Sequence, residues 1–405
     1  MRVSNSCALD FRENPVLIVA ADTIIGLTVL RSLGRRGVPV YCAYTIPDAL
    51  GPRSTYCRGS FRLPKEDQPA MTAILEHARR WKVTHLLAIS ERHIALLNRY
   101  RSELEGEFTL LFPRQEVFER ATRKNVTLDC ATRVGIQIPA TAYPQSIEEV
   151  EACRRLRFPV ILKMAHTQFP SGTNVVFRHK ALRVDTFEGL SQVLCQLPAG
   201  QFPMVQEYIP GSGVGMSMLM RDGNAVMAFQ HLRLRESPPE GGIGVFCEAM
   251  PVDPKLFEQS ERLLVEMGWD GVAMVEYRGD PETACYTLME VNGRFWGSLP
   301  TAIYAGADFP FWLYRTSFPA SILPPREYRA GLRARSLAGD TKWLLSVLRG
   351  RKKPAAQATA EYLAAFHPSV RYFVWNWDDP KPAVSNFLSR FWKRWHSAIK
   401  PNKGG

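Results

Sequence analysis

Short apolar runs alternate with amphipathic stretches over residues 15–89. The apolar runs have the length of strands buried on both faces, and the amphipathic stretches have the 3.6-residue period of helices. Strands that alternate with helices predict a parallel sheet of the Rossmann-like type. The predicted strands are 15–21, 38–43 and 84–89, and the predicted helices are 24–36 and 68–81.

Further along, helical periodicity mixes with strands that pair as hairpins. The dipeptide Asp222-Gly223 is a hairpin turn signal between two apolar runs, 215–220 and 225–230. A second hairpin is predicted from the runs 272–277 and 285–291, which flank a turn-rich segment. The remaining elements are helices at 115–120, 125–134 and 253–267, and strands at 158–163 and 204–210.

The second hairpin carries the strongest chemical signal. Glu290 and Asn292 are two residues apart, so their side chains project to the same side of the strand, and Glu276 on the partner strand can approach them. Two carboxylates and an amide oxygen are costly on an apolar hairpin unless a cation binds them. Mg²⁺ prefers such oxygen ligands and completes its shell with water and phosphate oxygens. The alternative is a solvated strand face on which Arg294 is an ion-pair partner.

The second strand of this hairpin and the helix after it resemble the C-terminal end of an ATP-grasp domain. The matching sequence is E-V-N-G-R-F-W-G-S at 290–298. Upstream, Lys124 precedes a helix and a G-I-x-x-P turn, Lys163 ends the strand F-P-V-I-L-K, and residues 204–210 read M-V-Q-E-Y-I-P. The resemblance spans residues 15–315, because these segments occur in the family's order and spacing.

The resemblance implies a binding site for ATP with Mg²⁺ or Mn²⁺. Two lysines would lie over the nucleotide phosphates, an acidic residue and the adjacent backbone would recognise adenine, and Arg294 would stabilise the transferring γ-phosphoryl group. The implied residues are Lys124 and Lys163 for phosphate; Glu207, Tyr208 and Ile209 for adenine; and Glu276, Glu290 and Asn292 for one or two metal ions.

The chain departs from the family pattern in two places. The segment that corresponds to the phosphate-covering lid, 166–174, contains one glycine. No carboxylate follows the adenine segment until Asp222, so the ribose-recognising residue is unassigned.

Charged residues also alternate on the strand that follows the first hairpin. His231, Arg233 and Arg235 would share one face, and the two arginines could hold the carboxylate or phosphate of an acceptor substrate. A solvated edge strand is the alternative. Ser90 and His93 follow the strand 84–89 at the end where α/β sheets place ligands, although Ser90 could simply start a helix.

Composition limits the remaining function classes. With 46% apolar and 22% charged residues, the 405-residue chain has an ordinary soluble composition. The eight cysteines form no C-x-x-C pair, which favours a reduced, cytoplasmic compartment. We find no signal-peptide pattern and no apolar run of membrane-spanning length. The first βα turn has only Gly26 where a dinucleotide fingerprint needs several glycines, which argues against NAD or FAD.

Most of the positive charge lies in the C-terminal part. The net charge is +12, and the residues from Gly331 onward carry 14 Lys and Arg against 4 Asp and Glu, a net +10. A last helix is predicted at 384–399, with Leu388, Phe391, Trp392, Trp395 and Ile399 on one stripe. Such a helix can pack on its own domain or lie on an anionic membrane at the inner face. No nucleic-acid-binding motif accompanies it, and a homodimer is left open.

These observations predict an α/β and α+β protein. A Rossmann-like preATP-grasp domain (15–112) would precede a two-lobed ATP-grasp domain (113–320, with a lid lobe at 140–210) and a basic helical extension (321–405). The expected function is an ATP-dependent ligase that phosphorylates a carboxylate and joins the acyl phosphate to an amine. The alternatives are carboxylation with bicarbonate, as in biotin carboxylase or purine biosynthesis, and a non-catalytic nucleotide-binding or membrane-associated scaffold.

Overall fold

The structure is a computed structural model that describes residues 11–164, 181–197, 202–318, 323–351 and 353–389. Its described residues form two compact units. The first unit draws on Met1–Phe112, Leu234–Ala249 and Arg294–Gly405, and the second on Pro113–Arg233 and Met250–Gly293. One boundary between the units falls at residue 112, where we expect the first domain to end. The expected extension at 321–405 does not form a separate unit and belongs to the first one. The three-domain division stays a prediction.

The first unit contains the expected parallel sheet, with strand order β3-β2-β1-β4-β5. All four residues of β1 are buried, which explains why the strand is an uninterrupted apolar run. Gly26 lies against the end of β1, where an added Cβ would be 2.6 Å from Ala21 Cα, so helix α1 can approach the sheet closely. The strands are β1 (Val16–Val19), β2 (Val40–Tyr44), β3 (Cys57–Arg62), β4 (His85–Ala88) and β5 (Thr109–Leu110).

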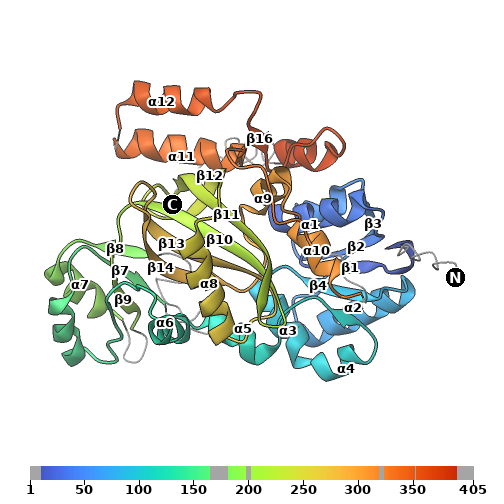
Figure 1. Cartoon of the computed structure of the whole chain (residues 1–405), viewed down its shortest axis with the longest axis horizontal. Coiled ribbons are helices and arrows are strands. Elements are labelled where there is room, and N and C mark those ends of the chain that lie inside the picture. The colour runs from blue at the N-terminus through green and yellow to red at the C-terminus, as the bar shows by residue number, and fades with distance from the viewer. Residues whose placement is uncertain (1–10, 165–180, 198–201, 319–322, 352, 390–405) are drawn as a thin grey trace, which may run out of the picture. The chain divides into compact units, whose positions relative to one another are not determined.

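Four helices connect these strands or follow them, as Figure 1 shows. They are α1 (Ile24–Arg35), α2 (Asp67–Arg80), α3 (Glu91–Arg99) and α4 (Arg101–Glu105), with single turns η1 (Phe11–Glu13) and η2 (Gly51–Arg53). The Rossmann-like part of the expected fold is therefore confirmed.

The C-terminal part of the first unit is mainly helical. Strand β15 (Arg333–Arg335) pairs antiparallel with β12 (Ile243–Met250) and parallel with β16 (Arg371–Tyr372). Helices α11 and α12 run side by side in Figure 1, and residues 381–389 form a further helix. The helices are α9 (Leu299–Ala305), α10 (Phe309–Arg315), α11 (Leu337–Gly350) and α12 (Ala355–Ala364).

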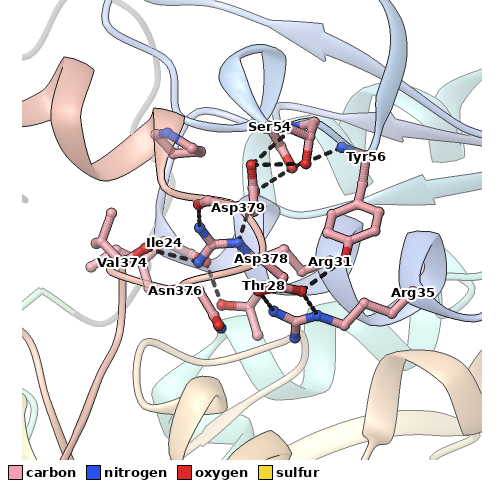
Figure 2. A network of polar contacts seen from close by, with 12 residues as sticks. Ile24, Thr28, Arg31, Arg35, Ser54, Tyr56, Val374, Asn376, Asp378 and Asp379 are labelled. Atoms are coloured by element: carbon pink, nitrogen blue, oxygen red, sulfur yellow. Dashed lines mark hydrogen bonds and ion pairs between the residues drawn. The ribbon is translucent and has the colours of Figure 1, made fainter.

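A buried carboxylate joins this C-terminal part to the parallel-sheet region within the first unit (Figure 2). Asp379 is fully buried and accepts hydrogen bonds from Arg31 Nε at 2.9 Å, Ser54 Oγ at 2.6 Å and Thr55 N at 2.9 Å. Arg31 also donates to the backbone carbonyls of Asp379 and Val374. Every oxygen of the carboxylate and every nitrogen of the guanidinium group has a partner, so burying the pair is tolerated.

The second unit contains two antiparallel sheets. The larger sheet has seven strands, of which this unit contributes the four in the order β14-β13-β10-β11, with helices α5, α6 and α8. Both predicted hairpins are present, namely β10–β11 and β13–β14. The bounds are β10 (Ser212–Arg221), β11 (Asn224–Ser237, which ends in the first unit), β13 (Gly271–Asp280), β14 (Cys285–Asn292), α5 (Gln115–Thr122), α6 (Lys124–Arg133) and α8 (Pro254–Glu266).

The smaller sheet has the order β6-β9-β7-β8 and its own apolar core, which includes Val160, Leu162, Leu190 and Val205. Its elements are β6 (Thr141–Ala142), η3 (Glu148–Arg155), β7 (Val160–Lys163), β8 (Leu182–Val184), α7 (Phe187–Leu194) and β9 (Met204–Glu207). The lid lobe at 140–210 stays a prediction. Among the described residues, no helix is both long enough and apolar enough to cross a membrane.

Candidate functional site

The β13–β14 hairpin places two carboxylates directly opposite each other. Glu276 pairs with Glu290, and Met274 pairs with Asn292. The register shifts just after Glu276, where a bulge lets β14 use one more residue than β13. Like charges at directly opposed positions destabilise a sheet, since their Cβ atoms lie about 4.5–5.5 Å apart. Nearby positive charge would therefore stabilise this part of the hairpin.

Two cationic side chains of the second unit pair with these carboxylates. Lys124 begins α6, and its Nζ lies 3.4 Å from Glu290 Oε2. Arg233 lies on β11 and donates both terminal nitrogens to the two oxygens of Glu276, with a Nη1–Oε1 distance of 2.7 Å. Each carboxylate is thus held by a different cation from a different element.

A second lysine, on the smaller sheet, interacts electrostatically with the same two carboxylates. Lys163 is the last residue of β7, and its Nζ donates to Gln206 Oε1 at 3.4 Å. Burial lowers the pKa of Lys163, and the negative charge of Glu290 acts in the opposite direction by stabilising the ammonium form. Gln206 is itself buried and donates to Thr141 Oγ1 at 3.2 Å, which orients its oxygen toward the lysine.

Asn292 completes the set of oxygen atoms. Its Nδ2 donates to Glu290 Oε1 at 3.3 Å, so Oδ1 points away from this bond and is available to a ligand. No group of three or more His, Cys, Asp or Glu side chains suitable for a metal occurs in the described part of the chain. Two carboxylates with one amide oxygen suit Mg²⁺ that takes its other ligands from water and phosphate, rather than a metal held by protein alone.

The expected adenine segment follows β9. Glu207 Oε1 accepts a hydrogen bond from Arg157 N at 2.8 Å, which fixes its side chain. The Tyr208 N–H donates to Pro159 O at 3.0 Å, and the Arg183 guanidinium lies 4.9 Å from the centre of the Tyr208 ring. The Tyr208 amide is therefore already engaged within the smaller sheet.

Two predicted site residues belong to the first unit instead. Arg294 donates through Nε to Glu91 Oε1 at 3.1 Å. Arg235 donates to Asp340 at 2.9 Å and lies 4.6 Å from the ring centre of Phe246. The structure brings Lys124, Lys163, Arg233, Glu276, Glu290 and Asn292 together in the second unit.

His231 is not part of an exposed basic face. It is fully buried opposite Gly215, where an added Cβ would be 2.3 Å from its ring. Burial lowers the pKa of His231 to about 3, and the nearby Arg233 acts in the same direction. Its imidazole is therefore neutral near pH 7 and packs as a core residue.

Sequence reasoning missed two residues of the site, Arg278 and Gln206. Arg278 is two residues after Glu276 on β13 and affects the charge state of Lys163. The same alternation that grouped Glu290 with Asn292 could have found Arg278. Lys124 and Arg233 pair with the two carboxylates, and Lys163 and Arg278 lie close enough for their charges to interact with each other, so the site is rich in positive charge and suits a polyanion. The lid segment 166–174 lies outside the described residues.

A Rossmann-like parallel sheet lies in the same chain as antiparallel sheets, and the resemblance to ATP-grasp proteins expected from the sequence motifs is confirmed at the level of the fold. Residues 201–338 match a family model described as "ATP-grasp in the biosynthetic pathway with Ter operon". No curated protein matches the sequence significantly.

Solved structures share the fold at low sequence identity. An L-amino acid ligase from Bacillus licheniformis is 15% identical, with a TM-score of 0.58 over 74% of this chain and 73% of that one. N5-carboxyaminoimidazole synthetase from Staphylococcus aureus is 11% identical, with a TM-score of 0.60 over 79% and 80%. A biotin carboxylase from Campylobacter jejuni, in a β-γ-ATP complex, is 15% identical, with a TM-score of 0.60 over 78% and 74%.

Proposed function

We propose that this protein is an ATP-dependent carboxylate–amine ligase that requires Mg²⁺ or Mn²⁺. The observation that carries the proposal is the pair of directly opposed carboxylates, Glu276 and Glu290, among four cations. This arrangement is costly in a structural hairpin but suits a metal that bridges nucleotide phosphates. The ATP-grasp fold, shared with a ligase and with carboxylases, supports the same class of reaction.

In this proposal the second unit binds the nucleotide. Lys124 and Lys163 neutralise its phosphates, while Glu207 and the backbone of Tyr208 and Ile209 take the adenine. Glu276, Glu290 and Asn292 would hold the metal, which would reduce the negative charge of the phosphates. Because Arg233 pairs with Glu276 in this structure, metal binding at Glu276 requires this arginine to move aside, where it can hold an acceptor carboxylate.

The reaction needs no covalent nucleophile from the protein. An oxygen of the substrate carboxylate attacks the γ-phosphorus, forming an acyl phosphate and releasing ADP. The neutral amine then attacks the acyl carbon, the C–O bond to the phosphate breaks, and an amide forms as inorganic phosphate leaves and the nitrogen releases a proton to water. Arg294 would stabilise the transferring phosphoryl group, since such transfer depends on positioning and charge stabilisation. We propose that Arg235 supports the structure around β11 and does not contact the substrate, because its guanidinium group already donates to Asp340.

Carboxylation of bicarbonate is the second candidate, supported by the shared fold of the biotin carboxylase and the synthetase. ADP release by the purified protein separates the candidates. A ligase requires both an acid and an amine from an amino-acid panel, and mass spectrometry then identifies the amide product. A carboxylase instead releases ADP with bicarbonate and an acceptor. A protein that binds MgATP without turnover under either condition would be a nucleotide-binding scaffold.

We also propose a cytoplasmic protein whose basic extension contacts anionic membrane. The support is the exposure of apolar side chains on the helix at 381–389, where Phe387 is 70% exposed and Leu388 49%. Flotation with vesicles of phosphatidylserine and phosphatidylcholine tests this, with a chain truncated after Pro380 as the comparison. Equal flotation of both proteins would contradict it. Gel filtration of the full chain decides whether it forms a homodimer.

A further inference from the structure

The first unit contains a cavity of about 320 Å³ that is lined by none of the residues assigned above to the nucleotide and the metal. Its lining residues lie at the carboxyl ends of β2 and β3 and in the first turn of α3, the helix that follows β4. In open parallel sheets ligands bind outside these strand ends, next to the point where the strand order reverses, which here lies between β1 and β4. The lining residues are Thr45, Arg62, Leu63, Pro64, Lys65, Arg92 and His93.

The lining of the cavity is basic. Three of its residues are cationic and none is acidic. Arg92 donates to the Lys65 carbonyl at 2.6 Å and approaches Asp67 Oδ1 at 3.5 Å. Arg62 and Lys65 are both exposed, so an anion from solution can reach them.

A buried acid, Asp22, lies near the cavity, and its negative charge acts on His93. Asp22 follows β1 and accepts hydrogen bonds from Thr45 N at 2.7 Å, Thr45 Oγ1 at 3.0 Å and Ile46 N at 3.1 Å. These bonds use both oxygens of its carboxylate to shape the loop after β2. Thr45 is thereby held at the wall of the cavity.

His93 adds a buried polar group to the wall. Its side chain is 8% exposed, and its Nδ1 lies 2.6 Å from Ser90 Oγ. Burial lowers the pKa of His93 to about 4, and the charge of Arg92 acts in the same direction, so the ring is neutral near pH 7. When the Ser90 hydroxyl donates to Nδ1, the proton of the ring resides on Nε2, which can then donate to a ligand.

We propose that this cavity binds a small metabolite through a single oxyanion, a phosphate monoester or a carboxylate, with Arg62, Lys65 and Arg92 as its cationic partners and His93 as a neutral donor. The volume exceeds that of a bare anion and suits a small molecule. The first βα turn is closed by the packing of Gly26 on Ala21, which leaves no glycine-rich loop for a pyrophosphate. The proposal does not depend on ATP binding in the second unit.

The test is calorimetric titration of the full chain with inorganic phosphate, and separately with acetate, at constant ionic strength. We expect saturable binding and at least a tenfold loss of affinity when Arg62→Gln is combined with Lys65→Gln. His93→Gln should weaken binding severalfold while the fold is retained by circular dichroism. The matched control combines Arg58→Gln, on the same strand, with Arg80→Gln, since neither residue lines the cavity.

Two further measurements show where the anion binds and whether the bound metabolite is a substrate of the proposed ligase. Glu290→Gln should leave phosphate binding unchanged; loss in this variant, with retention in the Arg62/Lys65 variant, would put the anion at the nucleotide site and overturn the proposal. Absence of saturable binding to wild type would also overturn it. If the double variant raises the KM for the acid substrate at constant kcat, the metabolite is a substrate of the proposed ligase. Unchanged KM with lost phosphate binding identifies a separate ligand.

Discussion

Two regions of this molecule hold carboxylates in different ways, one fully buried and the other partly exposed. In the first unit, Asp379 is fully buried and its oxygens accept hydrogen bonds from Arg31, Ser54 and Thr55 (Figure 2). In the second unit, Glu276 and Glu290 face each other across a hairpin, and cations outnumber them.

The difference separates a structural charge from a functional one. A charge that only holds the fold together is matched by its partners, because any uncompensated group would cost several kcal/mol. The hairpin has opposed carboxylates and surplus cations, a pattern that a bound metal and polyphosphate would balance. Four predictions test this comparison.

Asp379→Asn should have the largest effect on stability, about 3–5 kcal/mol, because Arg31 would stay buried without a counter-ion. Urea unfolding followed by circular dichroism measures the change in the free energy of unfolding. Glu290→Gln serves as the comparison and should change it by about 0.5 kcal/mol or less. A larger loss for Glu290→Gln than for Asp379→Asn would reverse the distinction between the two regions.

Glu290→Gln should instead lower kcat/KM for ATP-dependent turnover by about 100-fold or more, equivalent to roughly 2.7 kcal/mol, because the metal loses a carboxylate ligand. The measurement is ADP release at saturating Mg²⁺. The matched control is Glu282→Gln, an exposed position on the turn of the same hairpin. Normal turnover in Glu290→Gln would remove this residue from the site.

Mg²⁺ with a non-hydrolysable ATP analogue should stabilise the wild type, by about 2.7 kcal/mol at a ligand concentration 100 times Kd. Thermal unfolding with and without the ligand measures the gain. Asp378→Asn, in the structural region, should keep the full gain. In Glu290→Gln most of it should disappear, and an undiminished gain there would show that the ligand binds elsewhere.

Acid should weaken the structural region in a defined window. Hydrogen bonds from Arg35 lower the pKa of Asp378 to about 2 from a usual 3.8. Because the folded-state pKa is the lower one, the stabilisation is complete above pH 3.8 and is lost as the pH falls toward 2. For this half-exposed pair the loss should be about 1 kcal/mol or less. Urea unfolding between pH 5 and 2 should show a shallower decline for Asp378→Asn than for wild type or the control Asp222→Asn.

The pKa of Asp379 is lowered, as that of Asp378 is, but the physical causes differ. Burial by itself would raise the pKa of Asp379, but hydrogen bonds from Ser54, Thr55 and Arg31 outweigh burial and lower it overall. Its contribution to stability therefore also disappears on the acid side. The two neighbouring carboxylates show how partners, more than exposure, decide the direction of the shift.

The sequence by itself determined the local elements and much of the chemistry. Burial on both faces makes β1 an apolar run, and strand alternation places Glu290 and Asn292 on one side, since both follow from backbone geometry. Lys163 was recognisable because a lysine at the end of a buried strand needs a partner. These features depend on neighbouring residues only.

Only the tertiary structure decided which charges meet. The bulge after Glu276 sets it directly opposite Glu290, and Arg233 and Arg235, two residues apart on β11, take Glu276 and Asp340 as partners. Asp379 and Arg31 are 348 residues apart in sequence. Such pairings depend on register and on contacts between distant segments, and local periodicity contains no information about either.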